Sequence, residues 1–273
     1  MIDIEAVRIK KQNLIHYLES LDSLLVAFSG GVDSTLLLAL AHQALGEGVV
    51  AATATSAVHP SREKQEASEF ARERGIRHIV FKSGEMDLPR FVSNDANRCY
   101  YCKRDLIRKL LQLAEERGIK HVAHAANVDD LKDYRPGSKA AQETGILAPL
   151  LEVQLNKEEI RFLSRNLGLS TWSKPAMACL ASRIPYGTPI TEERLNMIDR
   201  AETFLLEQGL QQIRVRHHGP VARIEVSQKE MDRVLDKRLR RAIVEEFRRI
   251  GFAHIALDLE GYISGSMNRV LDI

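Results

Sequence analysis

The residues with the clearest chemical potential in this chain of 273 residues form one string, Ser29-Gly30-Gly31-Val32-Asp33-Ser34-Thr35. Two glycines allow the backbone to turn sharply and bring N–H groups close to an anion. An apolar run precedes the string and a helical pattern follows it, so the positive end of a helix points to the same place. The hydroxyls of Ser29, Ser34 and Thr35 add donors. The string predicts a pyrophosphate-binding loop, and it is not a Walker A loop because that motif's lysine is absent.

Three cysteines leave several kinds of chemistry open. Cys99 and Cys102 form a C-x-x-C pair at the start of an expected helix, and Cys179 lies in a distant proline-rich stretch. The pair suits a redox disulfide, because a helix N-terminus depresses a thiol pKa. Together, all three thiolates suit an iron–sulfur cluster. The alternative without chemistry is that the cysteines are simply buried in the protein interior, as free cysteines often are. Zinc needs a fourth ligand, for which the candidates are His59, His121 and His124.

A polar block, NVDDLKDYRPG at residues 127–137, follows an expected strand. It lies at the carboxyl edge, where open α/β sheets bind ligands. Asp129 and Arg135 are its candidate ligand-binding residues. Taken alone, such a block is typical of a solvated turn rich in Asx hydrogen bonds. The phosphate loop upstream favours a role in the active site.

Two expected strands near the C-terminus place arginines on one surface. Residues two apart share a strand face, so Arg214 and Arg216 point the same way, as do Arg223 and Glu225 on the next strand. If the two polar faces coincide, these planar guanidiniums suit bidentate binding of a phosphate. The alternative is a solvated sheet face with Arg–Glu cross-strand pairs.

The elements that carry these residues alternate short apolar runs with helical patterns, which is typical of a parallel sheet wrapped by helices. We expect strands at 24–28, 49–53, 78–81 and 121–125 and helices at 4–18, 34–45, 61–74 and 99–117. Beyond the proline-rich stretch we expect a helix at 191–208 and strands at 212–217, 221–226 and 254–259. The change of pattern predicts an α/β domain over residues 1–170 and a smaller α+β domain over residues 171–273.

The composition excludes some classes of protein. Lys and Arg total 39 against 37 Asp and Glu, a net charge of +2, which argues against a protein that coats nucleic acid. No apolar run approaches the length of a membrane span, and the polar start lacks the core of a signal peptide. We therefore expect a cytoplasmic protein with reduced thiols and no membrane partner.

The string SGGVDST resembles the PP-loop of the N-type ATP pyrophosphatases, which cleave ATP between the α and β phosphates. Three further stretches narrow the resemblance: DYRPG, the strands IRVR and ARIE, and KPAMACLASRIPYG at residues 174–187. Together they resemble the LarE family of ATP-dependent sulfur transferases over nearly the whole chain. The resemblance implies a PP-loop parallel sheet with helices on both faces, followed by a smaller α+β C-terminal domain.

The resemblance also implies a reaction. ATP adenylates a carboxylate of a pyridinium dicarboxylate mononucleotide, and sulfur displaces AMP to give the thiocarboxylate of a nickel-pincer cofactor pathway. Some LarE-like enzymes carry three cysteines that hold a [4Fe–4S] cluster, with one iron open to hydrosulfide. Others carry one cysteine in the interdomain loop and sacrifice its sulfur. Because Cys99 and Cys102 accompany Cys179, we expect the cluster, with sacrificial transfer from Cys179 as the alternative.

The implied cofactors are ATP, Mg²⁺ and the [4Fe–4S] cluster, and the implied residues fall into four groups. The nucleotide site takes Ser29, Gly30, Gly31, Asp33, Ser34, Thr35, Asp129 and Arg135. The catalytic group takes Cys179, Asp33, Ser182, Arg183 and Glu202. The substrate site takes Arg214, Arg216 and Glu225, and the cluster takes Cys99, Cys102 and Cys179.

Three other functions compete with this interpretation. A tRNA thiolase would use the same loop and cluster but should show a strongly basic surface. An amide-forming synthetase would need an ammonia source and no cysteine trio, and a nucleotide sensor would need no chemistry. We expect a small-molecule substrate, a sulfide donor, no nucleic-acid partner and a homo-oligomer.

Overall fold

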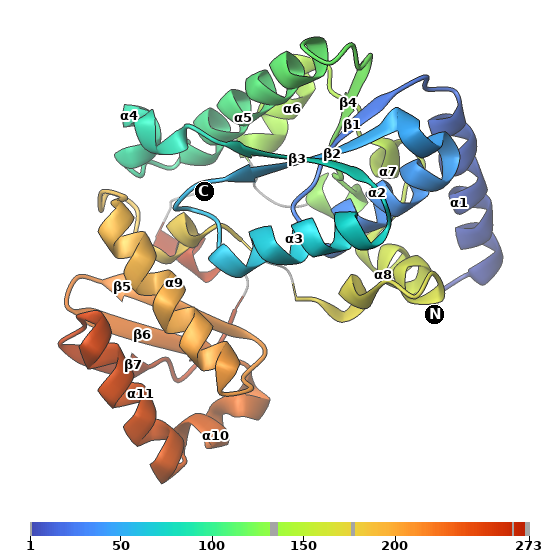
Figure 1. Ribbon diagram of the computed structural model, residues 1–273. Helices are drawn as coiled ribbons and strands as arrows, with labels where there is room; N and C mark the ends of the chain where they lie inside the picture. Colours follow the sequence, from blue (N-terminus) through green and yellow to red (C-terminus); the bar gives the residue numbers. More distant parts are fainter. Residues whose placement is uncertain (1, 132–135, 176–177, 264, 271–273) are drawn as a thin grey trace. The chain divides into compact units, whose positions relative to one another are not determined.

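The chain divides into two compact units in the computed structural model, which describes residues 2–131, 136–175, 178–263 and 265–270 (Figure 1). Unit 1 consists of Met1–Ser56, Ser61–Leu88 and Cys99–Met177. Unit 2 consists of Ala57–Pro60, Pro89–Arg98 and Ala178–Ile273.

This division differs from the expected one, because unit 2 begins at Ala178 and takes two short segments from the first half of the chain. Asn94 shows why. Its buried amide donates to the carbonyl oxygens of Pro185 and Thr188, each at 2.8 Å, so the segment around it is bonded to the proline-rich loop. Similarly, the backbone N–H of Leu180 donates to the carbonyl of Val58 at 2.8 Å. These bonds join residues far apart in sequence, which local periodicity does not reveal.

Unit 1 is built on the expected four-stranded parallel sheet, so the predicted fold class is confirmed. Its strands are β1 (Leu24–Ala27), β2 (Val49–Thr55), β3 (Arg77–Lys82) and β4 (His121–Ala123). Its helices are α1 (Ile4–Glu19), α2 (Val32–Leu45), α3 (Ser61–Glu73), α5 (Arg98–Glu115, whose first residue belongs to unit 2), α6 (Pro136–Thr144), α7 (Pro149–Glu152) and α8 (Lys157–Asn166).

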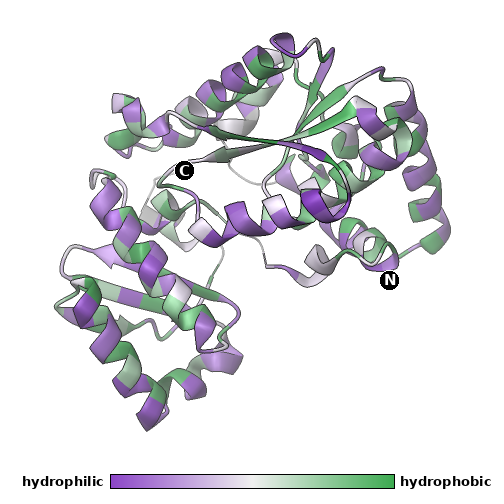
Figure 2. Cartoon of the chain, viewed as in Figure 1, coloured by the Kyte–Doolittle hydropathy of each residue, from purple (hydrophilic) through white to green (hydrophobic). Residues whose placement is uncertain are grey.

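Helices cover both faces of this sheet because β1 is apolar on both sides. Leu24 and Val26 belong to a core formed with α1, α2, α3 and α8, whereas Leu25 packs with Leu110 of α5 on the other face. Each such leucine contributes about 1.5–3 kcal/mol by leaving water. Figure 2 shows the apolar colouring of the central strands against the mixed colouring of the outer helices. The core therefore fixes the two strands that carry the phosphate loop and the polar block.

The strand order β3-β2-β1-β4 determines where a ligand binds. The chain moves outward from β1 through β2 to β3 and then returns to the other side of β1 with β4. In open α/β sheets the crevice lies at such a switch point, beyond the carboxyl ends of the two strands. The glycine string follows β1 and the polar block follows β4, so both reach this crevice.

Unit 2 packs helices on one face of a three-stranded sheet of order β5-β6-β7. Val215, Ile224 and Phe247 form part of its core. Antiparallel pairing places Arg214 opposite Glu225 and Arg216 opposite Arg223, so the two polar faces coincide as expected. The elements are α4 (Pro89–Val92), α9 (Glu192–Glu207), β5 (Ile213–His218), β6 (Val221–Val226), α10 (Met231–Leu235), α11 (Lys237–Ile250) and β7 (His254–Leu257).

Among the described residues, no helix is both long enough and apolar enough to cross a bilayer.

Candidate active site

The glycine string forms a tight turn into α2. Gly30 has a φ of +69°, which favours glycine, and a Cβ there would lie 3.5 Å from the Cβ of Ala67 in α3. Gly31 is the N-cap of α2, and no described side chain caps that end. The first N–H groups of the helix therefore remain available to an anion. Ser29 and Ser34 add hydroxyls whose oxygens lie 3.1 Å apart.

Thr35 is fully buried, and its hydroxyl has no hydrogen-bond partner within the described parts of the chain. A buried hydroxyl is normally paired, and leaving one unpaired is costly. The turn thus combines uncapped N–H groups with an unsatisfied hydroxyl. This donor set fits the phosphates of ATP.

Asp33 lies in the first turn of α2 and faces the polar block that follows β4. Its carboxylate accepts a 3.3 Å hydrogen bond from the amide of Asn127, and it is ion-paired with the ammonium of Lys157. The amide oxygen of Asn127 accepts the N–H of Asp129 at 2.9 Å. The switch point therefore brings Asp33 and Asp129 into one hydrogen-bonded network. Carboxylate oxygens of this kind suit Mg²⁺. Arg135 lies outside the described residues.

Two lysines that the sequence analysis did not assign to the phosphate loop contact it in the structure. The ammonium of Lys157 contacts Asp33, and that of Lys174 donates to the Gly30 carbonyl at 3.1 Å and to Glu66 at 2.6 Å. These lysines lie 124 and 144 residues from the groups they contact in the loop. Lys157 lies outside the quoted motifs, and Lys174 opens the stretch at residues 174–187, which carries no local signal that links it to the loop. Only the fold identifies these two contacts.

Cys99 and Cys102 lie about one turn apart near the start of α5, with Cys99 exposed and Cys102 half-buried. A Cβ on Gly137 of α6 would lie 3.4 Å from the Cys99 carbonyl, so α6 packs closely on this turn. Cys179 belongs to unit 2. Within the ranges that the structure describes, no three His, Cys, Asp or Glu side chains form a metal-binding group. The helix thus presents two of the three expected ligands on one turn.

Lys103 directly follows Cys102, and the pKa values of Lys103 and of the nearby His124 are both lowered. Burial lowers the pKa of Lys103, and the neighbouring Cys102 and Asp130 oppose that shift. Burial, together with the charge of Lys103, lowers the pKa of His124 to about 4. His124 is therefore neutral at pH 7. Sequence reasoning missed Lys103 because its burial depends on tertiary packing.

Arg183 braces the turn that carries Cys179 in unit 2. The Arg183 side chain is 0% exposed, and its Nε and Nη2 donate to the two carboxylate oxygens of Glu202, each at 2.9 Å. Its Nη1 donates to the carbonyl oxygens of Ala178 at 2.5 Å and Cys179 at 3.0 Å, and to the hydroxyl of Ser182 at 2.9 Å. The guanidinium therefore fixes the backbone on both sides of the Cys179 Cα.

The arginine face of β5 and β6 is paired internally. Arg216 donates to both carboxylate oxygens of Glu225, at 2.8 and 2.7 Å, and Arg223 donates to Glu225 at 3.1 Å. Arg214 lies over the ring of Tyr262, 4.9 Å from its centroid. Cross-strand Arg–Glu pairs are thus present, but Arg214, Arg216 and Glu225 are buried rather than solvated.

Arg216 also connects this face to the cysteine turn, because its Nη1 donates to the Ser182 carbonyl at 2.9 Å. Burial lowers the pKa of Arg214, and the charges of Arg183 and Arg216 act in the same direction, whereas Glu202 and Tyr262 oppose the shift. Guanidiniums that repel one another favour nearby anions, and Glu202 is one of them. The structure therefore brings the predicted residues Ser182, Arg183, Glu202, Arg214, Arg216 and Glu225 together with Cys179 in unit 2.

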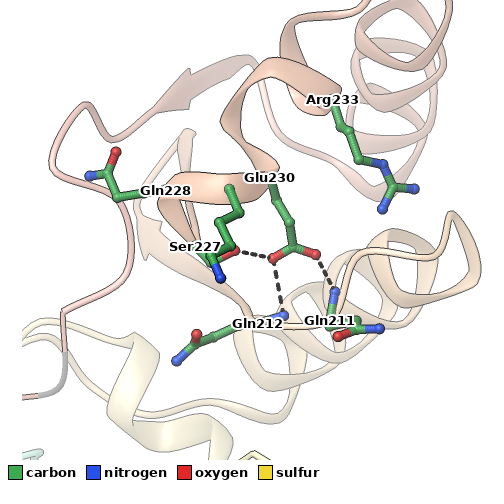
Figure 3. Close-up of a pocket in the computed structure, with 7 residues that line it drawn as sticks. Gln211, Gln212, Ser227, Gln228, Glu230 and Arg233 are labelled. Atoms are coloured by element: carbon green, nitrogen blue, oxygen red, sulfur yellow. Dashed lines mark hydrogen bonds between the residues drawn. The ribbon is translucent and has the colours of Figure 1, made fainter.

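A shallow pocket elsewhere in unit 2 is lined by Gln211, Gln212, Ser227, Gln228, Lys229, Glu230 and Arg233 (Figure 3). Burial raises the pKa of Glu230, but hydrogen bonds from Ser227 and from the backbone of Gln211 and Gln212 outweigh it and hold that pKa below its usual value. The carboxylate of Glu230 is therefore already satisfied by the turn that it holds. At this pocket Glu230 therefore serves the fold.

Comparisons with known proteins agree with this geometry. Residues 17–100, which contain the phosphate loop, match the family model described as asparagine synthase. An uncharacterised protein of Synechocystis is 43% identical over 262 residues, covering 96% of this chain and 98% of that protein. A glutamine-hydrolysing GMP synthase of Aeropyrum pernix is 26% identical over 206 residues, covering 68% of this chain and 40% of that protein.

A third relative is the pyridinium-3,5-bisthiocarboxylic acid mononucleotide synthase of Lactiplantibacillus plantarum. It is 34% identical over 265 residues, covering 96% of this chain and 95% of that enzyme. Two findings therefore agree. The two chains are similar over nearly their full lengths, and this chain has a phosphate loop at the switch point of its sheet. The chain belongs to the LarE family and is an ATP-dependent sulfurtransferase of the PP-loop type.

Proposed function

We propose that the enzyme adenylates a carboxylate of a pyridinium dicarboxylate mononucleotide and converts it to a thiocarboxylate. In the first step a carboxylate oxygen attacks the α-phosphorus of ATP, and the bond to the β-phosphate breaks to release pyrophosphate. In the second step hydrosulfide attacks the acyl carbon, AMP leaves with the bonding electron pair, and one proton is released. The phosphate loop and Asp33 serve the first step, with Mg²⁺ held by Asp33 and Asp129.

One observation carries this proposal: the hydrogen bond from Arg216 to the Ser182 carbonyl, which joins the arginine face to the turn of Cys179. A sulfur-transfer centre for an anionic substrate needs cations beside the thiol, and unit 2 supplies them on neighbouring residues. Four guanidiniums (Arg183, Arg214, Arg216, Arg223) meet three carboxylates (Glu202, Glu225, Asp258), which leaves one net positive charge. That charge suits a substrate that carries a phosphate and carboxylates.

We further propose that Cys99, Cys102 and Cys179 hold a [4Fe–4S] cluster. When bound, a cluster with three thiolate ligands supplies an open iron that binds hydrosulfide. The connectivity of the chain supports this ligand set, because Cys99 and Cys179 each lie within two residues of a point where the chain passes from one unit to the other. Cys99 is the first residue of its unit 1 segment, and Cys179 is the second residue of its unit 2 segment.

Protein purified without oxygen tests this proposal. It should be brown, contain about four irons per chain, and form thiocarboxylate over many turnovers when sulfide is supplied. Cys99→Ala, Cys102→Ala and Cys179→Ala should each lose the iron. The opposite result is colourless, iron-free protein that completes one turnover while Cys179 loses the mass of hydrogen sulfide. That result would replace the cluster with sacrificial transfer from Cys179.

A further inference from the structure

The phosphate loop begins at the peptide bond between Phe28 and Ser29, and this bond is held at both ends. Its N–H, which belongs to Ser29, donates to the hydroxyl of Ser34 at 3.3 Å. Its carbonyl, which belongs to Phe28, accepts the hydroxyl of Thr53 at 2.8 Å. A peptide bond is planar, so contacts at its two ends fix the direction of the whole unit. The glycine turn follows directly, and the directions of its N–H groups depend on this first plane.

Thr53 supplies a bond to the loop that the backbone of the sheet does not. β1 ends at Ala27, and the N–H of Phe28 still donates to the carbonyl of Ala52 in β2 at 2.8 Å. In a regular parallel ladder, an N–H of β2 would bind the Phe28 carbonyl next. Among the residues that the structure describes, no backbone N–H does so, and the Thr53 hydroxyl takes its place. A side chain therefore sets the point at which the chain leaves the sheet.

His78 of β3 holds that hydroxyl in turn, because its Nε2 lies 2.8 Å from the Thr53 oxygen. A carbonyl oxygen only accepts, so the single hydroxyl proton is given to Phe28, and the Thr53 oxygen accepts an N–H from Nε2. Burial lowers the pKa of His78, so its ring is mainly neutral at pH 7 and carries its one proton on Nε2. The bonds thus run in one direction, from the imidazole through the hydroxyl to the loop.

This chain of bonds lies in the protein interior. Phe28 and Thr53 are 2% and 5% exposed. The ring of Phe28 packs against Phe70 of α3 and edge-on against His78, with centroids 5.6 and 6.2 Å apart. In such surroundings an unpaired polar group is costly, so buried groups keep their partners. The direction of the first peptide plane is therefore strongly fixed.

We propose that Thr53 and His78 are positioning residues of the phosphate loop. The imidazole N–H holds the hydroxyl of Thr53, and the hydroxyl holds the Phe28 carbonyl, so that the N–H groups of the glycine turn point at the phosphates of ATP. Both side chains act through the backbone rather than by touching the nucleotide. The role concerns the binding of ATP and pyrophosphate, and it holds for either source of sulfur.

Calorimetric binding of Mg·ATP and Mg·pyrophosphate tests the role of Thr53 without relying on turnover. Thr53→Val keeps the shape of the side chain but removes the hydroxyl. Affinity for both ligands should fall about tenfold, because the N–H groups of the loop lose their fixed direction. Thr53→Ser keeps the hydroxyl and should bind both ligands within about threefold of wild type. AMP should bind to each variant within about threefold of wild type, since it lacks the pyrophosphate portion that the loop holds.

Thr144→Val is a matched control, because the hydroxyl of Thr144 also donates to backbone carbonyls, those of Ala140 and Ala141 within α6, each at 3.0 Å. It should leave every affinity unchanged. Unchanged binding of Mg·ATP and Mg·pyrophosphate by Thr53→Val would overturn the proposal, as would an equal loss for AMP. Binding by Thr53→Ser as weak as that of Thr53→Val would assign the effect to the methyl group and would also overturn it.

The proton on His78 provides a second test. Long-range ¹H–¹⁵N NMR of the wild-type enzyme labelled with ¹⁵N-histidine should show the Nε2–H tautomer at pH 7 for the ring whose signals vanish in His78→Gln. His78→Gln keeps an N–H donor and should bind Mg·ATP within about twofold of wild type, whereas His78→Leu should bind it about fivefold more weakly. An Nδ1–H tautomer would contradict the proposal, because the hydroxyl would then donate to the ring and not to the loop. Equal affinities of the two His78 variants would contradict it as well.

Discussion

The phosphate loop of unit 1 and the arginine face of unit 2 both suit anions, but they are built in different ways. The loop relies on backbone N–H groups at an uncapped helix start, and its lysines come from distant parts of the chain. The arginine face relies on charged side chains that are largely paired with carboxylates and buried. One site leaves donors open, whereas the other holds its charges in a fixed network.

This difference separates the roles of the two regions. An open loop is able to accept and release ATP and pyrophosphate in each cycle, because its donors remain available without rearrangement of the fold. A buried Arg–Glu network is costly to disturb, since removing one partner strands a charge away from water. It therefore suits the permanent positioning of Cys179 and of a substrate that must be held still.

The largest expected effect is on the stability of the network in unit 2. Glu202→Ala should lower the free energy of unfolding by about 3–5 kcal/mol, because it leaves the fully buried Arg183 without its carboxylate. Urea-induced unfolding measures this change. The matched variant Arg241→Ala removes an exposed pair with Glu245 in α11 and should change stability by about 0.5 kcal/mol or less. A loss below about 1 kcal/mol for Glu202→Ala would mean that the network is not rigid.

The next effect concerns catalysis at the loop. Asp33→Asn should reduce substrate-dependent formation of AMP and pyrophosphate by about a hundredfold or more, because it removes the carboxylate placed for Mg²⁺ while the fold remains. Chromatography of the nucleotide products measures the rate, and circular dichroism checks the fold. Formation of ADP and orthophosphate by the wild type would refute the PP-loop chemistry itself.

A smaller effect should distinguish the ligands of the two regions. Arg214→Gln should weaken binding of the mononucleotide substrate about ten- to a hundredfold, since a charge-assisted hydrogen bond contributes about 1.5–3 kcal/mol. ATP affinity should stay within about twofold, because ATP belongs to the loop. Calorimetry with each ligand separates the two. An equal loss of affinity for both ligands, or no loss for either, would contradict the assignment of ATP to the phosphate loop and of the substrate to the arginine face.

The smallest effect is a pH dependence that belongs to unit 1. His124 has a pKa of about 4 in the folded protein, below its value in an unfolded chain, so the unfolded state binds more protons as the pH falls. Stability should therefore decrease by about 1–2 kcal/mol between pH 7 and pH 5. His124→Asn should remove this part of the pH dependence of urea unfolding. An unaltered pH dependence in the variant would show that His124 does not titrate as described.

The two regions also differ in how far their sequences predict them. The phosphate loop is contiguous, so Gly30, Gly31 and Asp33 are identifiable from residue types and spacing alone. The arginine face was predictable from alternation along two strands, but its burial was not. Burial depends on the register that places Arg214 opposite Glu225 and on the brace that Arg183 provides.

Residues joined only by tertiary contacts escaped prediction. Lys157 and Lys174 reach the loop across more than a hundred residues, and Asn94 joins an early segment to the proline-rich loop. The expected boundary at residue 171 did not include the two early segments that belong to unit 2. Hydrophobic periodicity indicates single helices and strands, and it does not indicate which of them pack together. The strands and helices themselves were predictable, since apolar runs and glycine-ended helical patterns are local signals.

The most direct test of the account is pyrophosphate exchange by Cys179→Ala. If unit 1 activates the carboxylate and the Cys179 turn delivers sulfur, this variant should exchange labelled pyrophosphate into ATP at close to the wild-type rate when substrate is present, yet form no thiocarboxylate. Loss of exchange in a folded Cys179→Ala protein, or formation of thiocarboxylate by it, would contradict the division of the reaction between the two regions.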